Sequence, residues 1–150
     1  MEKSIRKIAV LIALFALISF EIPIQNESYA LTIIVEELRN SDGAVQFTLY
    51  NTEGSIPDQK FKAFYKMENA KISNGASSLT FNDLPKGRYA INVLHDENEN
   101  GKIDKGFILP IEGIGFSNYE SIGLSNRPNF SKASFELDSD TTVSVKIIYK

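Results

Sequence analysis

The sequence predicts an all-β fold, a single antiparallel β-sandwich with Greek-key connections formed by residues 31–150. Apolar and polar residues alternate with a period of two in most segments, as in strands that bury one face. Asp-Gly and Asn-Gly steps, which favour tight turns, separate several of these segments. No amphipathic helical pattern is longer than two turns. We therefore expect six or seven short strands in one domain, with a closed barrel as the alternative.

The strands can be placed in order along the chain. We expect them at residues 31–38, 44–50, 70–73, 77–82, 87–95, 130–137 and 141–149. The first two flank the turn at 40–43 and predict the clearest hairpin, and the next two flank Asn74-Gly75 and predict another. Residues 61–67 fit a short helix or an irregular strand, and residues 51–60 and 110–129 are expected to be loops.

The first thirty residues predict a cleaved signal peptide. Residues 1–7 carry a cluster of basic side chains, residues 8–20 are apolar, and residues 21–30 are more polar and end in Ser-Tyr-Ala. This order is typical of secretory signals. Cleavage after Ala30 would leave Leu31 first and no membrane span. The alternative is an uncleaved anchor, which Glu21 disfavours because a spanning helix needs about 20 apolar residues. We expect a secreted or periplasmic protein.

The composition excludes several classes of protein. The net charge is −3, and the first thirty residues carry as many acidic as basic side chains, so their removal leaves that charge unchanged. A mildly acidic chain without a basic block is a poor candidate for binding nucleic acid or an anionic membrane surface. The chain has no cysteine, which excludes disulfides and thiolate metal sites. Stability must therefore come from burial.

One segment has the spacing of a calcium loop. In residues 96–104 (DENENGKID), oxygen-bearing side chains fall at positions 1, 3, 5 and 9, and Gly101 is at position 6. In an EF-hand-type loop, alternate residues turn towards the cation and the glycine allows a sharp bend. The expected ligands are the side chains of Asp96, Asn98, Asn100 and Asp104 and the backbone carbonyl of Lys102.

This loop lacks one expected ligand. Position 12, which should be a bidentate carboxylate, is Phe107. Glu112 could replace it only if the chain curls back. Such an undercharged site should bind calcium weakly, with a dissociation constant of about 10⁻⁴ to 10⁻³ M. The alternative is a solvated β-turn, because Asn100-Gly101 is itself a turn signal that follows a strong strand. Both interpretations are retained.

Residues 81–89 (FNDLPKGRY) predict a structural corner. Pro85 and Gly87 set a tight turn, and Phe81, Leu84 and Tyr89 can meet beneath it. The segment resembles the F-x-x-L-P-x-G-x-Y corner of transthyretin-like (prealbumin-like) and carboxypeptidase-regulatory-like β-sandwiches. This resemblance implies a folding role for the corner.

His95 is the only histidine, and Asp96 follows it. A catalytic triad needs a base that contacts both a nucleophile and a carboxylate. Neighbouring residues on a strand point to opposite faces, and no G-x-S-x-G motif accompanies the pair. We therefore predict no catalytic residues and expect His95 to shape the polar loop. One histidine without cysteine also disfavours a zinc site.

Residues 110–118 (PIEGIGFSN) are glycine-rich but lack both the G-x-G-x-x-G spacing and a following helix. We expect a loop folded over one end of the sandwich and anchored by Phe116. The alternative is a loop that contacts a ligand or a partner, because function gathers on loops held by rigid scaffolds.

Residues 84–104, 110–118 and 127–135 together resemble the domain of unknown function 2141 family of exported bacterial proteins. The shared pattern is L-P-x-G-x-Y-A…H-D-x-N-x-N-x-x-x-D…P-x-E-G-x-G-F-S-N…P-x-F-x-x-A, and the resemblance covers nearly all of residues 31–150. It implies a secreted or periplasmic β-sandwich without an assigned activity. It also groups signature positions that are compatible with one polar site, namely His95, Asp96, Asn98, Asn100, Asp104, Glu112, Phe116 and Asn118. That Glu112 completes a calcium shell is our own hypothesis.

Three functions follow as alternatives. The first is a non-catalytic, monomeric envelope module that binds a protein or glycan partner, with or without calcium as a cofactor. The second is a small-ligand carrier, by analogy of fold, which needs an apolar cavity of roughly 300 Å³ or more. The third is a hydrolase that uses His95 with Asp96 or Glu112. The missing catalytic motif favours the first.

Overall fold

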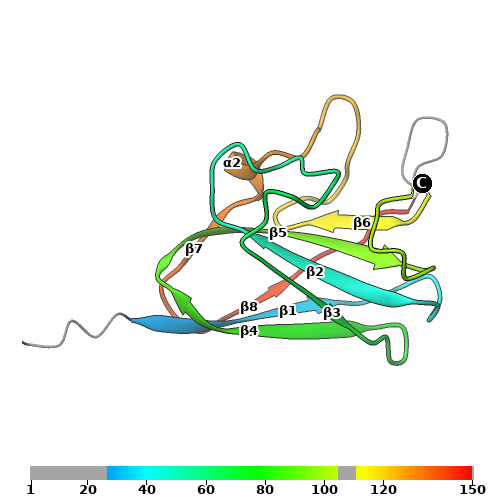
Figure 1. Ribbon diagram of the computed structural model, residues 1–150, viewed down its shortest axis with the longest axis horizontal. Helices are drawn as coiled ribbons and strands as arrows, with labels where there is room; N and C mark the ends of the chain where they lie inside the picture. Colours follow the sequence, from blue (N-terminus) through cyan, green and yellow to red (C-terminus); the bar gives the residue numbers. More distant parts are fainter. Residues whose placement is uncertain (1–26, 105–110, 150) are drawn as a thin grey trace, which may run out of the picture.

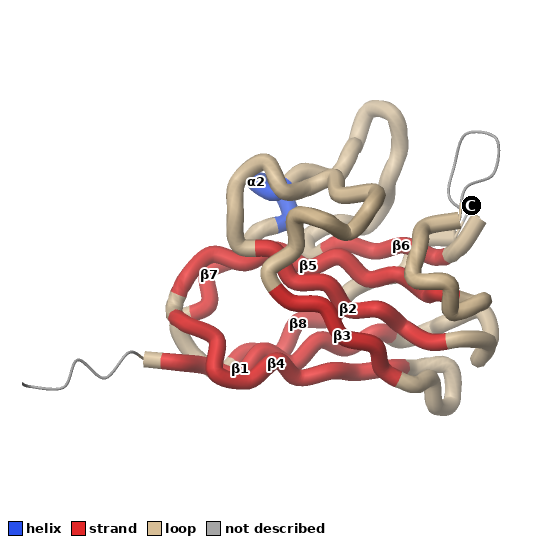
Figure 2. Tube along the Cα trace, viewed as in Figure 1, coloured by secondary structure: helices blue, strands red, loops and turns tan. Residues whose placement is uncertain are grey.

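Two β-sheets pack face to face in the computed structural model, which describes residues 27–104 and 111–149 (Figure 1). The strands are β1 (Ser28–Val35), β2 (Ala44–Tyr50), β3 (Lys66–Ala70), β4 (Ser77–Pro85), β5 (Gly87–Asp96), β6 (Gly113–Phe116), β7 (Phe135–Leu137) and β8 (Thr141–Ser144), and the helix α2 (Phe130–Ala133) precedes β7. The smaller sheet has the order β4-β1-β8. The larger has the order β3-β2-β5-β6, with β7 paired to β5 (Figure 2). The predicted β-sandwich is confirmed.

The predicted signal peptide lies mostly outside the described residues. β1 begins within its last three residues, where Ser28 pairs with Pro85 and Tyr29 with Leu84. The backbone N–H of Ala30 also donates to the Asp140 carboxylate, at 2.9 Å. The predicted cleavage point after Ala30 therefore falls inside a paired strand.

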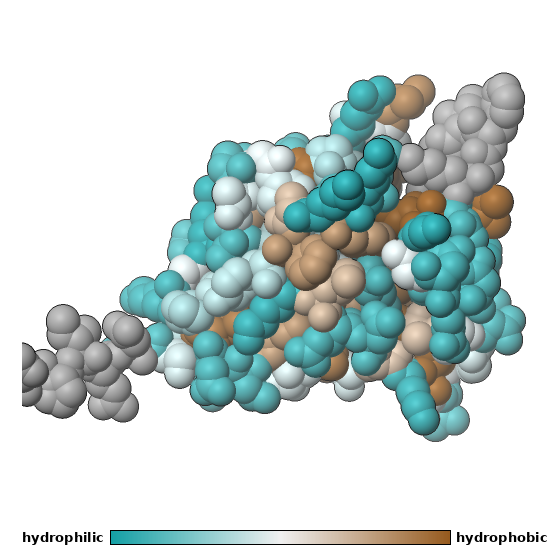
Figure 3. All heavy atoms as spheres, viewed as in Figure 1, coloured by the Kyte–Doolittle hydropathy of each residue, from teal (hydrophilic) through white to brown (hydrophobic). Residues whose placement is uncertain are grey.

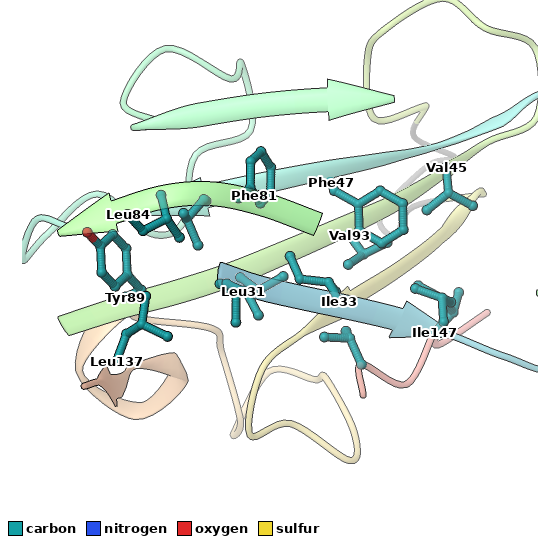
Figure 4. Close-up of a cluster of buried hydrophobic side chains, with 14 of the residues drawn as sticks. Leu31, Ile33, Val45, Phe47, Phe81, Leu84, Tyr89, Val93, Leu137 and Ile147 are labelled. Atoms are coloured by element: carbon teal, nitrogen blue, oxygen red, sulfur yellow. The ribbon is translucent and has the colours of Figure 1, made fainter. Parts of the chain in front are cut away.

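A single core fills the space between the sheets (Figure 4). Alternate residues of β1, β2 and β5 are buried there, as the period-two pattern predicts. Its main members are Leu31, Ile33, Val35, Val45, Phe47, Leu49, Phe81, Leu84, Tyr89, Ile91, Val93 and Leu137. Full burial of one such side chain is worth about 1.5–3 kcal/mol. Because the chain has no cysteine, burial in this core is what stabilises the fold in place of disulfides.

The predicted hairpin of the first two strands is wrong. β1 pairs with β4 and β8, whereas β2 pairs with β3 and β5. The two strands belong to different sheets and bury their apolar faces against each other across the core. In a hairpin, by contrast, both apolar faces would lie on the same side of one sheet. The connection between them therefore crosses from sheet to sheet. Glu37 and Gly43 in this connection have positive φ values of 58° and 66°.

Asn74-Gly75 forms the predicted tight turn, with Ser73 bridged to Ala76 and both turn residues at positive φ. β3 and β4 on its two sides nevertheless belong to different sheets, so the predicted hairpin does not extend beyond the turn. The corner at 81–89 is also a crossing between sheets. The hydroxyl group of Tyr89 donates to the Pro85 carbonyl at 2.8 Å, which fixes this corner.

Three further segments differ from expectation. Residues 61–65 form neither helix nor strand, and β3 begins only at Lys66. The predicted strand at 130–137 is interrupted by α2, because the Asn129 side chain caps the N–H of Lys132. β8 runs parallel to β1, with Ile33 opposite Val143, whereas we expected antiparallel pairs throughout.

β6 lies within the segment that was expected to be a loop. It pairs with the end of β5, where His95 lies opposite Gly113 and Asn92 opposite Phe116. Its glycines allow the C-terminal segment to pack directly on the strand. A Cβ atom on Gly115 would lie 2.4 Å from the Lys146 carbonyl oxygen, and one on Gly113 would lie 2.3 Å from the Tyr149 ring. The glycine-rich motif is thus explained by packing.

A second apolar cluster includes residues of α2, and this helix lies beside the larger sheet (Figure 1). The buried members of the cluster are Tyr50, Ile56, Ala90, Phe116, Tyr119, Phe130 and Ala133. These residues come from β2, β5, β6, α2 and the loops that follow β2 and β6. The cluster anchors the long connections on that side of the sandwich.

Candidate functional site

The loop that follows β5 folds around the side chain of Asp96. Asp96 is 2% exposed, and its carboxylate accepts hydrogen bonds from the backbone N–H groups of Asn100 (3.1 Å) and Gly101 (2.7 Å). Gly101 has a φ of +69°, a conformation that glycine adopts at little cost. A carboxylate has about four lone-pair sites, so Asp96 retains acceptor capacity after making these bonds.

The Asp104 carboxylate collects the amide groups of the same loop. The Nδ2 atom of Asn98 donates to it at 2.6 Å, and that of Asn100 lies 3.1 Å from both of its oxygens. The amide oxygens accept from the backbone instead, that of Asn98 from Asn100 N–H (3.1 Å) and that of Asn100 from Lys102 N–H (2.8 Å). The two side-chain amides of this loop therefore converge on the Asp104 carboxylate.

Glu112 lies immediately before β6 and contacts the loop at residues 96–104. It is 3% exposed, and its two oxygens accept the backbone N–H groups of Glu97 and Asp104, each at 3.1 Å. Burial raises the pKa of Glu112, and the charges of Asp96 and Asp104 raise it further, while the two hydrogen bonds oppose the rise. Glu112 thus joins the two ends of the loop.

Residues of the β1–β2 connection bond to the first part of the loop at residues 96–104. The Arg39 guanidinium forms an ion pair with Glu97, with its Nε atom 2.9 Å from Oε1, and Asn40 donates to the same carboxylate. Hydrogen bonding from Arg39 lowers the pKa of Glu97. Arg39 also lies over the Tyr149 ring, 4.7 Å from its centroid. Sequence reasoning missed Arg39 and Tyr149, because no local pattern connects positions so far apart.

His95 is fully buried beneath this end of the sandwich. Its Nε2 atom lies 3.0 Å from the Asp42 carbonyl oxygen, and its Nδ1 atom lies 2.7 Å from the Tyr149 hydroxyl. Both ring nitrogens are thereby satisfied without a carboxylate. This arrangement fits a structural histidine and does not supply the nucleophile–base–carboxylate contacts of a hydrolase.

Phe116 and Asn118 lie apart from the loop. Phe116 is 6% exposed in the second apolar cluster, where it meets the Tyr119 ring. The Asn118 side-chain amide lies 3.1–3.3 Å from the carbonyl oxygens of Lys132, Ala133 and Ser134. The structure therefore divides the signature positions between the loop at residues 96–104 and the contact with α2.

The neighbouring Ser117 was not predicted as important. It is fully buried, and its hydroxyl accepts from the Ile91 N–H at 2.9 Å and donates to the Ala133 carbonyl at 2.6 Å. Ser117 and Asn118 thus link β5 and β6 to the end of α2. Asn129 could have been identified as a helix cap, because asparagine before an apolar residue is a typical N-cap signal.

A separate pocket of about 670 Å³ lies where the edges of the two sheets meet. It is lined by Glu36, Glu37, Phe116, Asn118, Tyr119, Glu120, Ser144 and Lys146. Lys146 lies 3.4 Å from the Glu120 carboxylate. Charged side chains at its rim distinguish this pocket from the apolar cavity that a carrier of hydrophobic ligands needs.

Two further findings concern residues 27–104 and 111–149. No three histidine, aspartate or glutamate side chains there converge closely enough to hold a metal ion as they stand. No helix of that part is long and apolar enough to span a membrane.

Comparison with known proteins gives one strong match. A family model described as "Uncharacterized protein conserved in bacteria (DUF2141)" matches residues 33–145. No curated protein matches the chain.

Two solved structures are weakly similar to this chain. One is a fimbrial assembly protein from Parabacteroides distasonis ATCC 8503, with 10% identity, a TM-score of 0.34, and coverage of 79% of this chain and 53% of that one. The other is a pilus-presented adhesin, Spy0125 (Cpa), with 16% identity, a TM-score of 0.27, and coverage of 81% and 27%. The chain thus spans about half of the first and about a quarter of the second. Both scores are too low to support an argument about function.

Proposed function

This chain belongs to the DUF2141 family of uncharacterized proteins conserved in bacteria, and we propose that it is a non-catalytic β-sandwich module of the cell envelope that binds calcium at residues 96–104. One observation carries the proposal. The Asp104 carboxylate collects the amide donors of Asn98 and Asn100, while Glu112 joins the two ends of the same loop. Oxygen-bearing side chains are therefore brought together in this loop.

Calcium binding requires a local rearrangement of both carboxylates and amides, because no three acidic side chains among the described residues converge closely enough to hold a metal ion as they stand. Rotation of the two amide groups about their Cβ–Cγ bonds would turn their oxygens towards a cation beside Asp104. Calcium takes 6–8 oxygen ligands, and the candidates are Asp96, Asn98, Asn100, Asp104, Glu112 and the Lys102 carbonyl. Because the amide oxygens must give up bonds to the backbone, we expect weak binding, with a dissociation constant of about 10⁻⁴ to 10⁻³ M.

Charge also supports a cation at this loop. Asp96 and Asp104 repel the Glu112 carboxylate, and burial adds to the cost of its negative charge. An opposite charge nearby favours the ionised form of such groups. A divalent cation beside these groups would therefore relieve this repulsion.

The envelope location rests on the N-terminal pattern of basic, apolar and polar segments. Dissociation constants in the expected range are typical of calcium modules that work outside the cell. We therefore propose that export brings the loop to a compartment where a weak calcium site is occupied. Its partner would be a protein or a glycan of that compartment.

Thermal unfolding with added calcium tests the proposal. For the protein purified after natural processing, 10 mM calcium should raise the melting temperature by a few degrees, because a ligand that binds only the folded state stabilises it by mass action. Asp104→Asn should abolish most of the rise. Glu99→Gln is the matched control, because Glu99 is an exposed residue of the same loop outside the expected ligand set.

Two results would contradict calcium binding at this loop. One is a melting temperature that 10 mM calcium leaves unchanged. The other is an equal rise in the wild type and in Asp104→Asn. Isothermal titration of the wild type with calcium and with magnesium distinguishes a specific calcium site from a general effect of ionic strength.

A further inference from the structure

The outer edge of the larger sheet is an unpaired strand. β3 is the last strand of the order β3-β2-β5-β6, and no other strand of the described residues pairs with its outer edge. Figures 1 and 2 show β3 in front of the sandwich, with no element lying across it. An edge of this kind presents free backbone donors and acceptors to another chain.

Apolar side chains gather beside this edge. Three of the large hydrophobic residues that remain exposed lie within four positions of the chain: Phe64 (38%), Tyr65 (39%) and Met67 (37%). Figure 3 shows hydrophobic residues on the front face of the molecule, over the region of β2 and β3, with hydrophilic residues around them. An apolar patch with a polar rim is typical of an interaction surface.

The charges of β3 are self-complementary. Lys66 and Glu68 lie opposite Leu49 and Phe47 of β2, on the face that continues the core, whereas Met67 lies opposite Thr48 on the other face. If two copies of β3 pair antiparallel with Met67 opposite Met67, each Lys66 faces the Glu68 of the other copy. A register centred on Glu68 would instead place two like charges opposite each other, which is unfavourable.

We propose that β3 pairs with β3 of a second copy of this chain, antiparallel and about a two-fold axis at Met67. The two larger sheets then form one continuous sheet. Opposite charges meet on one face, and the two Met67 side chains meet on the other. A contact confined to one short strand per copy is small beside standard interfaces of about 1,600 Å². The dimer is therefore in equilibrium with the monomer that the sequence predicted.

Charge reversal tests both the surface and the register. For the protein purified after natural processing, sedimentation velocity over about 0.01–1 mM should show concentration-dependent dimerisation, as expected for a small interface. Lys66→Glu places a second glutamate opposite each Glu68, and Glu68→Lys places two lysines opposite each other. Each should weaken association by about tenfold or more, the fold-change that corresponds to roughly 1.4 kcal/mol. Lys86→Glu, on the exposed turn between β4 and β5, is the control and should dimerise normally.

Two combinations separate a charge effect from a folding defect. The double variant Lys66→Glu/Glu68→Lys restores opposite charges across the axis and should dimerise like the wild type. An equimolar mixture of the two single variants should also form dimers, because one strand then carries two glutamates and the other two lysines. A wild type that stays monomeric at 1 mM overturns the proposal. Single variants that dimerise like the wild type, or combinations that fail to restore association, also overturn it.

Discussion

The Tyr149 hydroxyl lies 2.7 Å from Nδ1 of His95 and links the C-terminal segment to the end of β5. Nε2 of the same ring lies 3.0 Å from the Asp42 carbonyl oxygen. A carbonyl can only accept, so Nε2 donates to it, and in the neutral ring Nδ1 then accepts from the tyrosine. Three separate segments of the chain therefore meet at one buried imidazole.

Tyr149→Phe should destabilise the protein by about 1–3 kcal/mol, because it leaves the buried Nδ1 atom of His95 without a donor. Urea unfolding measures the change. Tyr65→Phe is the control, because Tyr65 is partly exposed and water can solvate its hydroxyl; it should change stability by less than about 0.5 kcal/mol. Equal effects of the two variants would contradict a structural role for the His95–Tyr149 bond.

Thr48→Val should stabilise the protein. Thr48 is fully buried on β2, and its hydroxyl has no hydrogen-bond partner among the described residues. Replacing a buried, unsatisfied hydroxyl with a methyl group of similar shape should gain about 1 kcal/mol. Thr32→Val is the control, because the Thr32 hydroxyl already bonds to Thr80 across the strands at 2.9 Å. A loss of stability in Thr48→Val, measured by urea unfolding, would show that the hydroxyl is satisfied in solution.

Gly115→Ala should cost about 1–3 kcal/mol, the usual effect of overpacking. Its Cβ atom would collide with the Lys146 carbonyl oxygen, at 2.4 Å. Hydrogen exchange at Ile148, whose N–H bonds to the Ile114 carbonyl at 2.9 Å, should accelerate as the C-terminal segment lifts from β6. Gly123→Ala has open space around its Cβ position and should leave both measurements unchanged. Slow exchange at Ile148 in Gly115→Ala would refute this close contact.

Ser117→Ala should destabilise the protein by about 1–3 kcal/mol, because it leaves two buried backbone groups, Ile91 N–H and the Ala133 carbonyl, without this partner. The control is Ser134→Ala, whose hydroxyl bonds only within its own exposed turn. Guanidinium unfolding of the two variants gives the comparison. Similar stabilities for both would mean that water replaces the Ser117 hydroxyl.

The Arg39–Glu97 pair should contribute stability that depends on pH. Because the folded-state pKa of Glu97 is lowered, its contribution is full above the unfolded value of about 4.3 and disappears as pH falls through the folded pKa. Arg39→Gln should therefore cost less than about 1 kcal/mol at pH 7, since the pair is partly exposed. The difference from the wild type should shrink as pH falls below about 4.3. Urea unfolding from pH 3 to pH 7 tests this, and a difference that is constant with pH would contradict it.

The sequence predicted those parts of the fold that depend on local patterns. Alternation in β1, β2 and β5 identified the residues that form the core, and the turn at Asn74-Gly75 was recognised from its two residues. Pairing between strands was not predictable in the same way. Alternation shows which face of β1 is buried, but β2 and β4 offer equally apolar faces, and only packing of the whole sandwich selects β4 as its neighbour.

The sequence likewise predicted only the part of the candidate site that depends on local spacing. The spacing of Asp96, Asn98, Asn100 and Asp104 is a local signal, and the structure joins these residues in one hydrogen-bonded loop. Arg39 and Tyr149 contact that end of the molecule from distant parts of the chain, and one sequence holds no signal for such contacts. Phe116 and Asn118 were grouped with the loop because the family pattern contains all of these positions. In the structure, both residues contact α2 or the residue that follows it.

The parallel pairing of β1 with β8 also affects how the protein can fold during its synthesis. The smaller sheet needs Leu31 beside Thr141, so a ribosome must complete nearly the whole domain before β1 gains its second neighbour. Pairing across so long a stretch of chain slows folding, because loop-closure entropy is lost before the contacts form. A nascent chain that ends before Thr141 therefore leaves one edge of β1 unpaired and accessible to chaperones. The export proposed above, if it takes place in an unfolded state, would gain time from this delay.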